Sequence, residues 1–186
     1  LQFFGKDVID TLLELPMIVS PVALGAMILI FSNTPLGMTI RNTGVEFVFT
    51  IYGIFLAQFA TTAGIAVRLI KATMDEIPTR YEDAAKTLGA SPIKVFFTIA
   101  IPLSKNGIMA AAILTWAKAL GEFGATITVA GSMAMKTETV PIAIFMRLAN
   151  ADVEGTVFFV LILILVGLGT LYGVRVLTKK PSSYTA

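Results

Sequence analysis

The stretch TVFFVLILILVGLGTLYGV, residues 156–174, carries no charged side chain. A helix rises 1.5 Å per residue, so a helix of this length covers most of the roughly 30 Å hydrocarbon core of a bilayer. A lipid interior offers no water to backbone N–H and C=O groups, so a stretch that crosses it must satisfy them internally, as a helix does. The stretch therefore predicts a membrane-spanning helix.

The composition of the whole chain agrees with a protein embedded in lipid. Of its 186 residues, 56% are hydrophobic and 14% are charged, and the mean hydropathy is +0.84, whereas soluble domains carry about a quarter charged residues. The chain has no Cys and no His, which excludes disulfides, thiolate metal sites and imidazole chemistry. A net charge of +2, with cations dispersed along the chain, does not indicate a nucleic-acid-binding protein.

Three further apolar stretches are long enough to cross a bilayer. We expect four membrane helices in all, at residues 8–32, 45–67, 107–131 and 156–177. The first stretch contains Pro16 and Pro21, which kink a helix and leave backbone groups unpaired. Such groups are tolerated at membrane depth only where protein or water satisfies them, so this helix is expected to pack inside a bundle.

Positively charged residues predict the orientation of the chain, because short loops rich in Lys and Arg stay in the cytoplasm. If segment 68–105 is cytoplasmic, most cations are cytoplasmic with it: Lys6, Arg68, Lys71, Arg80, Lys86, Lys94, Lys105, Arg175, Lys179 and Lys180. Only Arg41, Lys136 and Arg147 then fall outside, and Lys118 lies within a span.

Four crossings place both ends of the chain in the cytoplasm. Residues 140–149 must then form a short external or re-entrant helix, because a fifth crossing would put the C-terminal cations outside. We expect a single transmembrane domain at residues 1–180, with a cytoplasmic loop at about 68–105, followed by a short cytoplasmic tail at residues 181–186.

The cytoplasmic loop contains the segment PTRYEDAAKTLGASPIKVFFTIAIPL, residues 78–103. Thr79 and Glu82 have the spacing of a capping box, so a helix is expected to begin near Arg80. Gly89 suits the left-handed position just after the end of that helix. Ser91 and Pro92 suit the N-cap and first turn of a second helix, so the segment predicts a helix, a tight turn and another helix.

One face of the first predicted helix is small and apolar. It gathers Tyr81, Ala84, Ala85 and Leu88 at positions i, i+3, i+4 and i+7. A helix lying on lipid headgroups is one interpretation, although such helices favour larger apolar faces and cationic polar faces. Docking into a groove on a protein partner explains the alanines better.

The same segment resembles the EAA signature of permease subunits of ATP-binding-cassette (ABC) importers. The resemblance rests on Asp83-Ala84-Ala85, on Gly89 four residues later, and on Ile99 with Ile101-Pro102, where Asp83 stands for Glu and Ile101 for Leu. In that family the loop is a coupling helix that inserts into a cytoplasmic ATPase subunit. The resemblance implies that the following residues form the ATPase-coupling site: Thr79, Tyr81, Glu82, Asp83, Ala84, Ala85, Leu88, Gly89, Ala90 and Ser91.

A second block resembles the permeases for molybdate, tungstate and sulfate. It consists of ALGEFGATIT at residues 119–128 and TVPIAI at 139–144, and the paired prolines within residues 14–25 resemble a helix of the same permeases. The resemblance implies an all-α, MetI-like polytopic helix bundle in the plasma membrane of a prokaryote. That family has at least one further N-terminal helix, so we expect one or more helices to be missing here.

The resemblance also implies the partners and the cargo. We expect a homodimer with its pathway at the two-fold interface, joined by two ABC ATPase subunits that use ATP and Mg, and visited by an extracytoplasmic oxyanion-binding protein. Molybdate or tungstate is the expected cargo, and sulfate or thiosulfate is the alternative. The chain contains no G-x-x-x-x-G-K-[ST] loop, so we expect a partner to handle the nucleotide. We also expect the chain to bind no cofactor or metal and to have no catalytic residue.

Polar residues within the predicted spans are candidates for a pathway or gate. Lys118 and Glu122 lie four residues apart, close enough to form an ion pair that serves either a gate or helix packing. Neutral polar groups either bond between helices or together line a path for an oxyanion. They are Ser20, Gln58, Thr61, Thr62, Thr115, Thr126 and Thr128.

Two other classes of protein remain open at this level. An ion-coupled secondary transporter or channel needs no ATPase, but is expected to show inverted repeats or midplane acidic sites, of which Glu122 is the single hint. A membrane scaffold that does not transport could present the same loop to a soluble partner.

Overall fold

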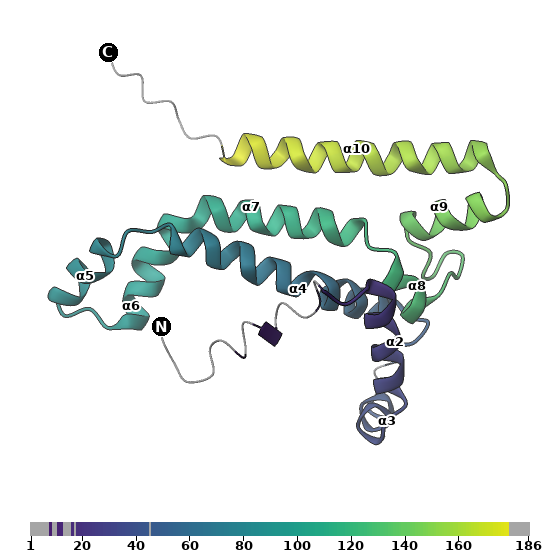
Figure 1. Ribbon diagram of the computed structural model, residues 1–186, viewed down its shortest axis with the longest axis horizontal. Coiled ribbons are helices and arrows are strands. Elements are labelled where there is room, and N and C mark those ends of the chain that lie inside the picture. The colour runs from purple at the N-terminus through teal and green to yellow at the C-terminus, as the bar shows by residue number, and fades with distance from the viewer. Residues whose placement is uncertain (1–7, 9–10, 13–15, 17, 45, 179–186) are drawn as a thin grey trace, which may run out of the picture.

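The computed structural model describes residues 8, 11–12, 16, 18–44 and 46–178, and within these ranges the chain is helical without a strand. Three long helices lie side by side: α4 (Ile51–Asp75), α7 (Ile101–Leu120) and α10 (Val153–Thr178). Helix α7 packs against both of the others (Figure 1). The predicted all-α architecture is confirmed.

The short helices gather at the two ends of these long ones (Figure 1). At one end are α5 (Arg80–Thr87) and α6 (Pro92–Val95), and α6 continues through a π-helical turn, η1 (Phe96–Ala100), into α7. At the other end are α2 (Pro21–Ser32), α3 (Pro35–Asn42), α8 (Gly124–Ala130) and α9 (Val140–Ala149).

Arg175, predicted to be cytoplasmic, and Arg147, predicted to be external, lie at opposite ends of the bundle. Arg175 lies in the last turn of α10, which points toward the α5 end, whereas Arg147 lies in the last turn of α9 at the opposite end. Among the residues that the structure describes, three helical stretches are long and apolar enough to cross a membrane: Ile51–Asp75, Pro92–Leu120 and Val153–Val176. A fourth crossing is present if α2 and α3, which are bent by 75° at their junction, count as one broken span.

The predicted boundaries of the membrane helices need correction. The stretch 156–177 lies inside α10 as expected, but 8–32 is not one helix, because Ser20 has an extended backbone (ψ 144°) and caps α2. The stretch 45–67 is also misplaced, since Thr50 caps α4 and the helix continues to Asp75. The residues of the first stretch before Pro21 lie largely outside the described ranges, as does the predicted tail at 181–186.

The stretch 107–131 is the largest error in the predicted helices. Helix α7 starts earlier and ends at Leu120, and three residues then separate it from α8. The predicted helix at 140–149 is confirmed with both of its bounds as α9, which at 10 residues is too short to cross the bilayer.

The buried core is centred on α8. Ala57 of α4 and Ala125 and Val129 of α8 are fully buried, and Ile28 of α2 packs against them. Gly124 lets α8 approach α2, because a Cβ there would lie 3.0 Å from Val22 Cγ2. Small residues thus allow close helix contact at this end of the bundle.

Candidate coupling loop and intramembrane polar residues

Helix α5 begins at Arg80 as predicted, but not through a capping box. The backbone of Thr79 is already helical (φ −56°, ψ −25°), and its side chain makes no capping bond. A capping side chain needs an extended backbone in order to reach the free N–H groups of the first turn. The start of the helix is instead held by backbone bonds from Tyr81 N–H to Pro78 O, 3.2 Å, and from Asp83 N–H to Thr79 O, 3.0 Å.

The end of α5 has the predicted glycine geometry. Gly89 has φ +79°, the left-handed conformation that glycine adopts without a Cβ penalty. Its N–H donates to Lys86 O at 2.9 Å, and Ala90 N–H donates to Ala85 O at 3.0 Å, a bond that turns the chain sharply out of the helix. Ser91 then accepts a bond from Lys94 N–H at 3.4 Å, with Pro92 in the first turn of α6, so this part of the prediction is confirmed.

The apolar face of α5 is open to a partner. None of its residues is buried, Leu88 is 88% exposed and Tyr81 is 42% exposed. The polar side carries a small charge network in which Lys86 lies 3.6 Å from Glu82 and 3.4 Å from Asp83. Such exposed pairs add little stability, so this surface is free to exchange its contacts for those of a partner.

The candidate coupling loop is connected directly to a long helix. Helix α5 packs against α6 and η1, and η1 runs into α7 without an intervening loop. The π-turn ends two residues before Pro102, whose ring would clash with the carbonyl one turn earlier in a regular α-helix. A force applied to α5 therefore acts on the start of α7.

Lys118 and Glu122 form the predicted ion pair, with 3.8 Å between Nζ and Oε2. They do not share one helix, however, because α7 ends at Leu120 and Glu122 lies in the gap before α8. The Glu122 side chain is 2% exposed and that of Lys118 is 50% exposed. Glu122 Oε1 also accepts a bond from Ala125 N–H at 3.1 Å.

Most of the predicted pathway hydroxyls bond within their own helices. Thr61 donates to Ala57 O at 3.1 Å, Thr62 to Gln58 O at 2.6 Å, and Thr128 to Gly124 O at 2.7 Å. Ser20 accepts a bond from Ala23 N–H at 3.3 Å. These bonds go to the backbone of the same helix or helix cap and not to a neighbouring helix, so they neither join helices nor gather the hydroxyls at one site.

Other polar groups are buried without a partner. The hydroxyl oxygens of Thr115, Thr126 and Thr139 make no hydrogen bond in the structure. Gln58 and Thr139 line one small hollow of about 160 Å³, together with Leu120 and residues of α9 and α10. Thr139 was not among the pathway candidates predicted from the sequence, because it precedes a short helix outside the predicted spans.

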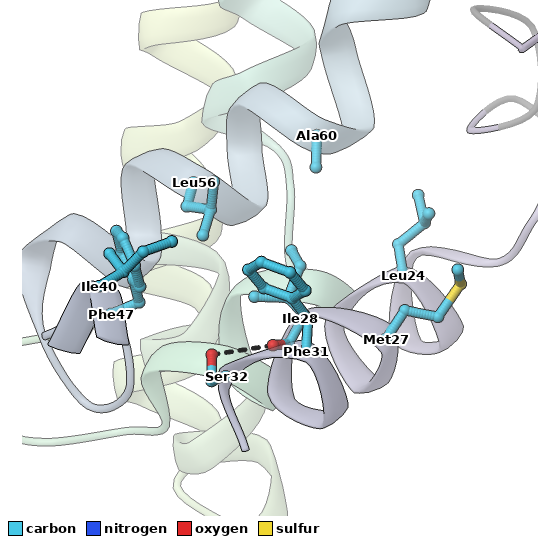
Figure 2. A pocket seen from close by; sticks show the side chains of 9 residues that line it. All are labelled: Leu24, Met27, Ile28, Phe31, Ser32, Ile40, Phe47, Leu56 and Ala60. Atoms are coloured by element: carbon cyan, nitrogen blue, oxygen red, sulfur yellow. Dashed lines mark hydrogen bonds between the residues drawn. The ribbon is translucent and has the colours of Figure 1, made fainter. Parts of the chain in front are cut away.

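A larger hollow near α2 is unsuited to an anion. Its volume is about 400 Å³, and it lies between α2, α3 and α4 (Figure 2). Its one hydroxyl, on Ser32, already donates to Ile28 O at 2.9 Å. An oxyanion there would lose its hydration without gaining hydrogen bonds. The lining residues are Leu24, Met27, Ile28, Phe31, Ser32, Ile40, Phe47, Leu56 and Ala60.

An ion pair at the opposite end of the bundle was also not predicted. Arg147 at the end of α9 lies 2.5 Å from Asp152, and its guanidinium stacks 5.1 Å from the ring centre of Phe159. The Gly155 N–H bond and Arg147 hold the pKa of Asp152 below its ordinary value of 3.8. The pair fixes the turn between α9 and α10.

The long apolar helices and the bent helix pair define a polytopic integral membrane protein. The chain belongs to the family of binding-protein-dependent transport system inner membrane components, whose model matches residues 1–182. The resemblance drawn from the EAA-like loop is confirmed at the level of the family.

Individual relatives come from two groups of transport systems. The chain is 36% identical over 156 residues to the molybdenum transport system permease protein ModB of Haemophilus influenzae, covering 82% of this chain and 68% of that protein. It is 36% identical over 146 residues to ModB of Escherichia coli, covering 77% and 64%. It is 29% identical over 187 residues to the sulfate transport system permease protein CysW of Synechocystis, covering 100% and 68%. The chain thus spans about two thirds of the length of these relatives.

Proposed function

We propose that this chain is the permease subunit of an ABC importer that moves an oxyanion, with molybdate or tungstate foremost, into a prokaryotic cell. The observation that carries the proposal is the exposed helix α5 with Asp83-Ala84-Ala85 and a left-handed Gly89 at one end of the apolar bundle. Family membership supports the permease role, and the names of the relatives support the class of cargo.

In this proposal the chain does no covalent chemistry. Two partner ATPase subunits bind and hydrolyse ATP with Mg, and each receives α5 of one permease in a groove. Two permease copies form the pathway between them. Closing of the ATPase subunits moves α5, and the movement passes through η1 to the long helices and opens the pathway to alternate sides.

Selection of the cargo is assigned to an extracytoplasmic binding protein. Lys118, the cation in the last turn of α7, is already paired with Glu122. Neutral hydroxyl and amide groups suit a pathway that must release an anion as readily as it admits one. Sulfate or thiosulfate remains the second candidate cargo, since sulfate permeases are among the relatives.

Reconstitution tests the proposal. The protein is placed in vesicles with its ATPase and its binding protein, and molybdate uptake is measured with and without ATP, in competition with tungstate and sulfate. ATP-dependent uptake that tungstate suppresses more than sulfate does is the expected result. Uptake driven by an ion gradient without the ATPase would instead favour a secondary transporter, and partner binding without flux would favour a scaffold.

A further inference from the structure

The gap between α7 and α8 contains the one charged side chain that is buried in the described part of the chain, Glu122. The gap consists of Gly121, Glu122 and Phe123, which follow the last residue of α7. Both carboxylate oxygens of Glu122 are engaged, one on each side of the gap.

On the α8 side, Glu122 acts as the cap that Phe123 lacks. Phe123 occupies the N-cap position of α8 and has no polar group to offer. Glu122 Oε1 accepts the bond from Ala125 N–H at 3.1 Å, so the carboxylate satisfies a free N–H group of the first turn.

On the α7 side, Glu122 Oε2 lies 3.8 Å from Nζ of Lys118, in the last turn of α7. A buried carboxylate is costly unless it is paired and hydrogen-bonded, and both conditions are met here. Because Lys118 is half exposed, the pair has one buried member and one at the surface of the chain.

The two helices joined in this way have different surroundings. Helix α7 continues back through η1 and α6 to the coupling loop, with unbroken helical structure from Pro92 to Leu120. Helix α8 is held in the core, where Ala125, Thr126 and Val129 are fully buried and the helix packs on α2 and α4. Glu122 is therefore a direct side-chain link between α7 and α8, in addition to the packing of both helices on α4.

We infer that Glu122 is a positioning residue that makes α7 and α8 move together, so that movement of the coupling loop reaches the far end of the bundle. This inference rests on the proposed function. Of the two roles that the sequence left open for Glu122, pathway gate or ion pair for helix packing, it favours the second, because one carboxylate oxygen accepts from Ala125 N–H and the other lies beside Lys118. The Phe123 ring, 5.0 Å from that of Phe145, extends the same link to α9.

Three variants distinguish the hydrogen bond from Ala125 N–H to Glu122 from the ion pair between Glu122 and Lys118. Glu122→Gln keeps an oxygen that accepts from Ala125 N–H but abolishes the ion pair, Lys118→Gln abolishes the ion pair from the other side, and Glu122→Ala removes both bonds. The readout is the number of oxyanions taken up per ATP hydrolysed in vesicles, together with the amount of ATPase bound. Arg147→Gln, which breaks an ion pair away from the gap, is the matched control.

We expect uptake per ATP to fall roughly threefold to tenfold in Glu122→Gln and Lys118→Gln, and further in Glu122→Ala, while ATPase binding and hydrolysis persist. The control keeps the wild-type ratio. If uptake and hydrolysis fall in proportion, so that the ratio is unchanged in both Gln variants, Glu122 is only structural and the inference is wrong. Wild-type vesicles that show no ATP-driven uptake would instead refute the proposed function itself.

Discussion

Gly107 of α7 lies directly against Thr73 of α4. A Cβ on Gly107 would overlap Thr73 Cγ2 and would lie 2.8 Å from Thr73 Oγ1 and 3.0 Å from its Cβ. The Thr73 hydroxyl is itself tied to Leu69 O at 3.0 Å, so the side chain cannot turn aside without losing that bond. This contact sets the separation of α4 and α7 next to the coupling loop.

Gly107→Ala is expected to destabilise the protein by about 1–3 kcal/mol, because the added methyl group must push the two helices apart. The measurement is the thermal unfolding midpoint in detergent, which should fall by several degrees. Thr73→Ala in the same chain removes the colliding Cγ2 and should restore most of the loss.

Gly167→Ala is the control for this contact, since nothing lies within 4 Å of a Cβ at Gly167. It should leave the midpoint unchanged or raise it slightly, because alanine favours a helix over glycine. A Gly107→Ala protein that melts with the wild type would show that α4 and α7 are not in this contact.

Gly89 offers a test of the coupling loop that depends on backbone conformation alone. Nothing lies within 4 Å of a Cβ there, so a substitution acts only through the φ of +79°. Gly89→Val should cost about 1–2 kcal/mol and misdirect the turn into α6, whereas Gly89→Asn, which tolerates this conformation better, should cost less. We expect Gly89→Val to co-purify with less ATPase than Gly89→Asn. Equal co-purification and transport for Gly89→Val and the wild type would contradict the coupling assignment.

Asp152 predicts a pH-dependent contribution to stability. Its pKa is lowered by the Gly155 N–H bond and by Arg147, so the folded state favours the ionised form. The contribution is fully present above the ordinary pKa of 3.8 and is lost as the pH falls through the lower folded value. The wild type should melt above Asp152→Asn at pH 7, and the difference should close on acidification.

Glu154→Gln serves as the comparison for Asp152, since it removes a neighbouring carboxylate that takes no part in these bonds. It should show no such convergence with the wild type. A gap between Asp152→Asn and the wild type that stays constant down to the lowest pH would mean that the Arg147 pair does not stabilise the fold.

Local signals predicted much of the fold. The left-handed Gly89 and the Ser91 cap follow from short-range preferences of single residues, whereas the short helix α9 was predicted from the distribution of Lys and Arg. The long apolar stretches indicated the lipid environment, because the length of an apolar helix is the dominant requirement for crossing a bilayer.

Helix boundaries were predicted wrongly where a helix ends inside a continuous apolar stretch because of its packing. Residues 107–131 read as one span, yet the helix ends at Leu120, since Glu122 caps a second helix and α8 is drawn into the core by Gly124 and Ala125. Helix α3 was not predicted, because it lies between the expected stretches 8–32 and 45–67, although Thr34 and Pro35 carry a cap signal. The Thr79 capping box failed because neighbouring backbone bonds had already closed the turn.

The central claim is that α5 faces the cytoplasm and enters a partner ATPase. The chain has no cysteine, so Leu88→Cys on α5 and Met135→Cys at the opposite end, both on strongly exposed positions, give single labels in an otherwise silent protein. A membrane-impermeant maleimide should label Met135→Cys in intact cells. It should label Leu88→Cys only after permeabilisation, and less when the ATPase is bound. Labelling of Leu88→Cys from outside, or labelling that the ATPase does not change, would contradict the account.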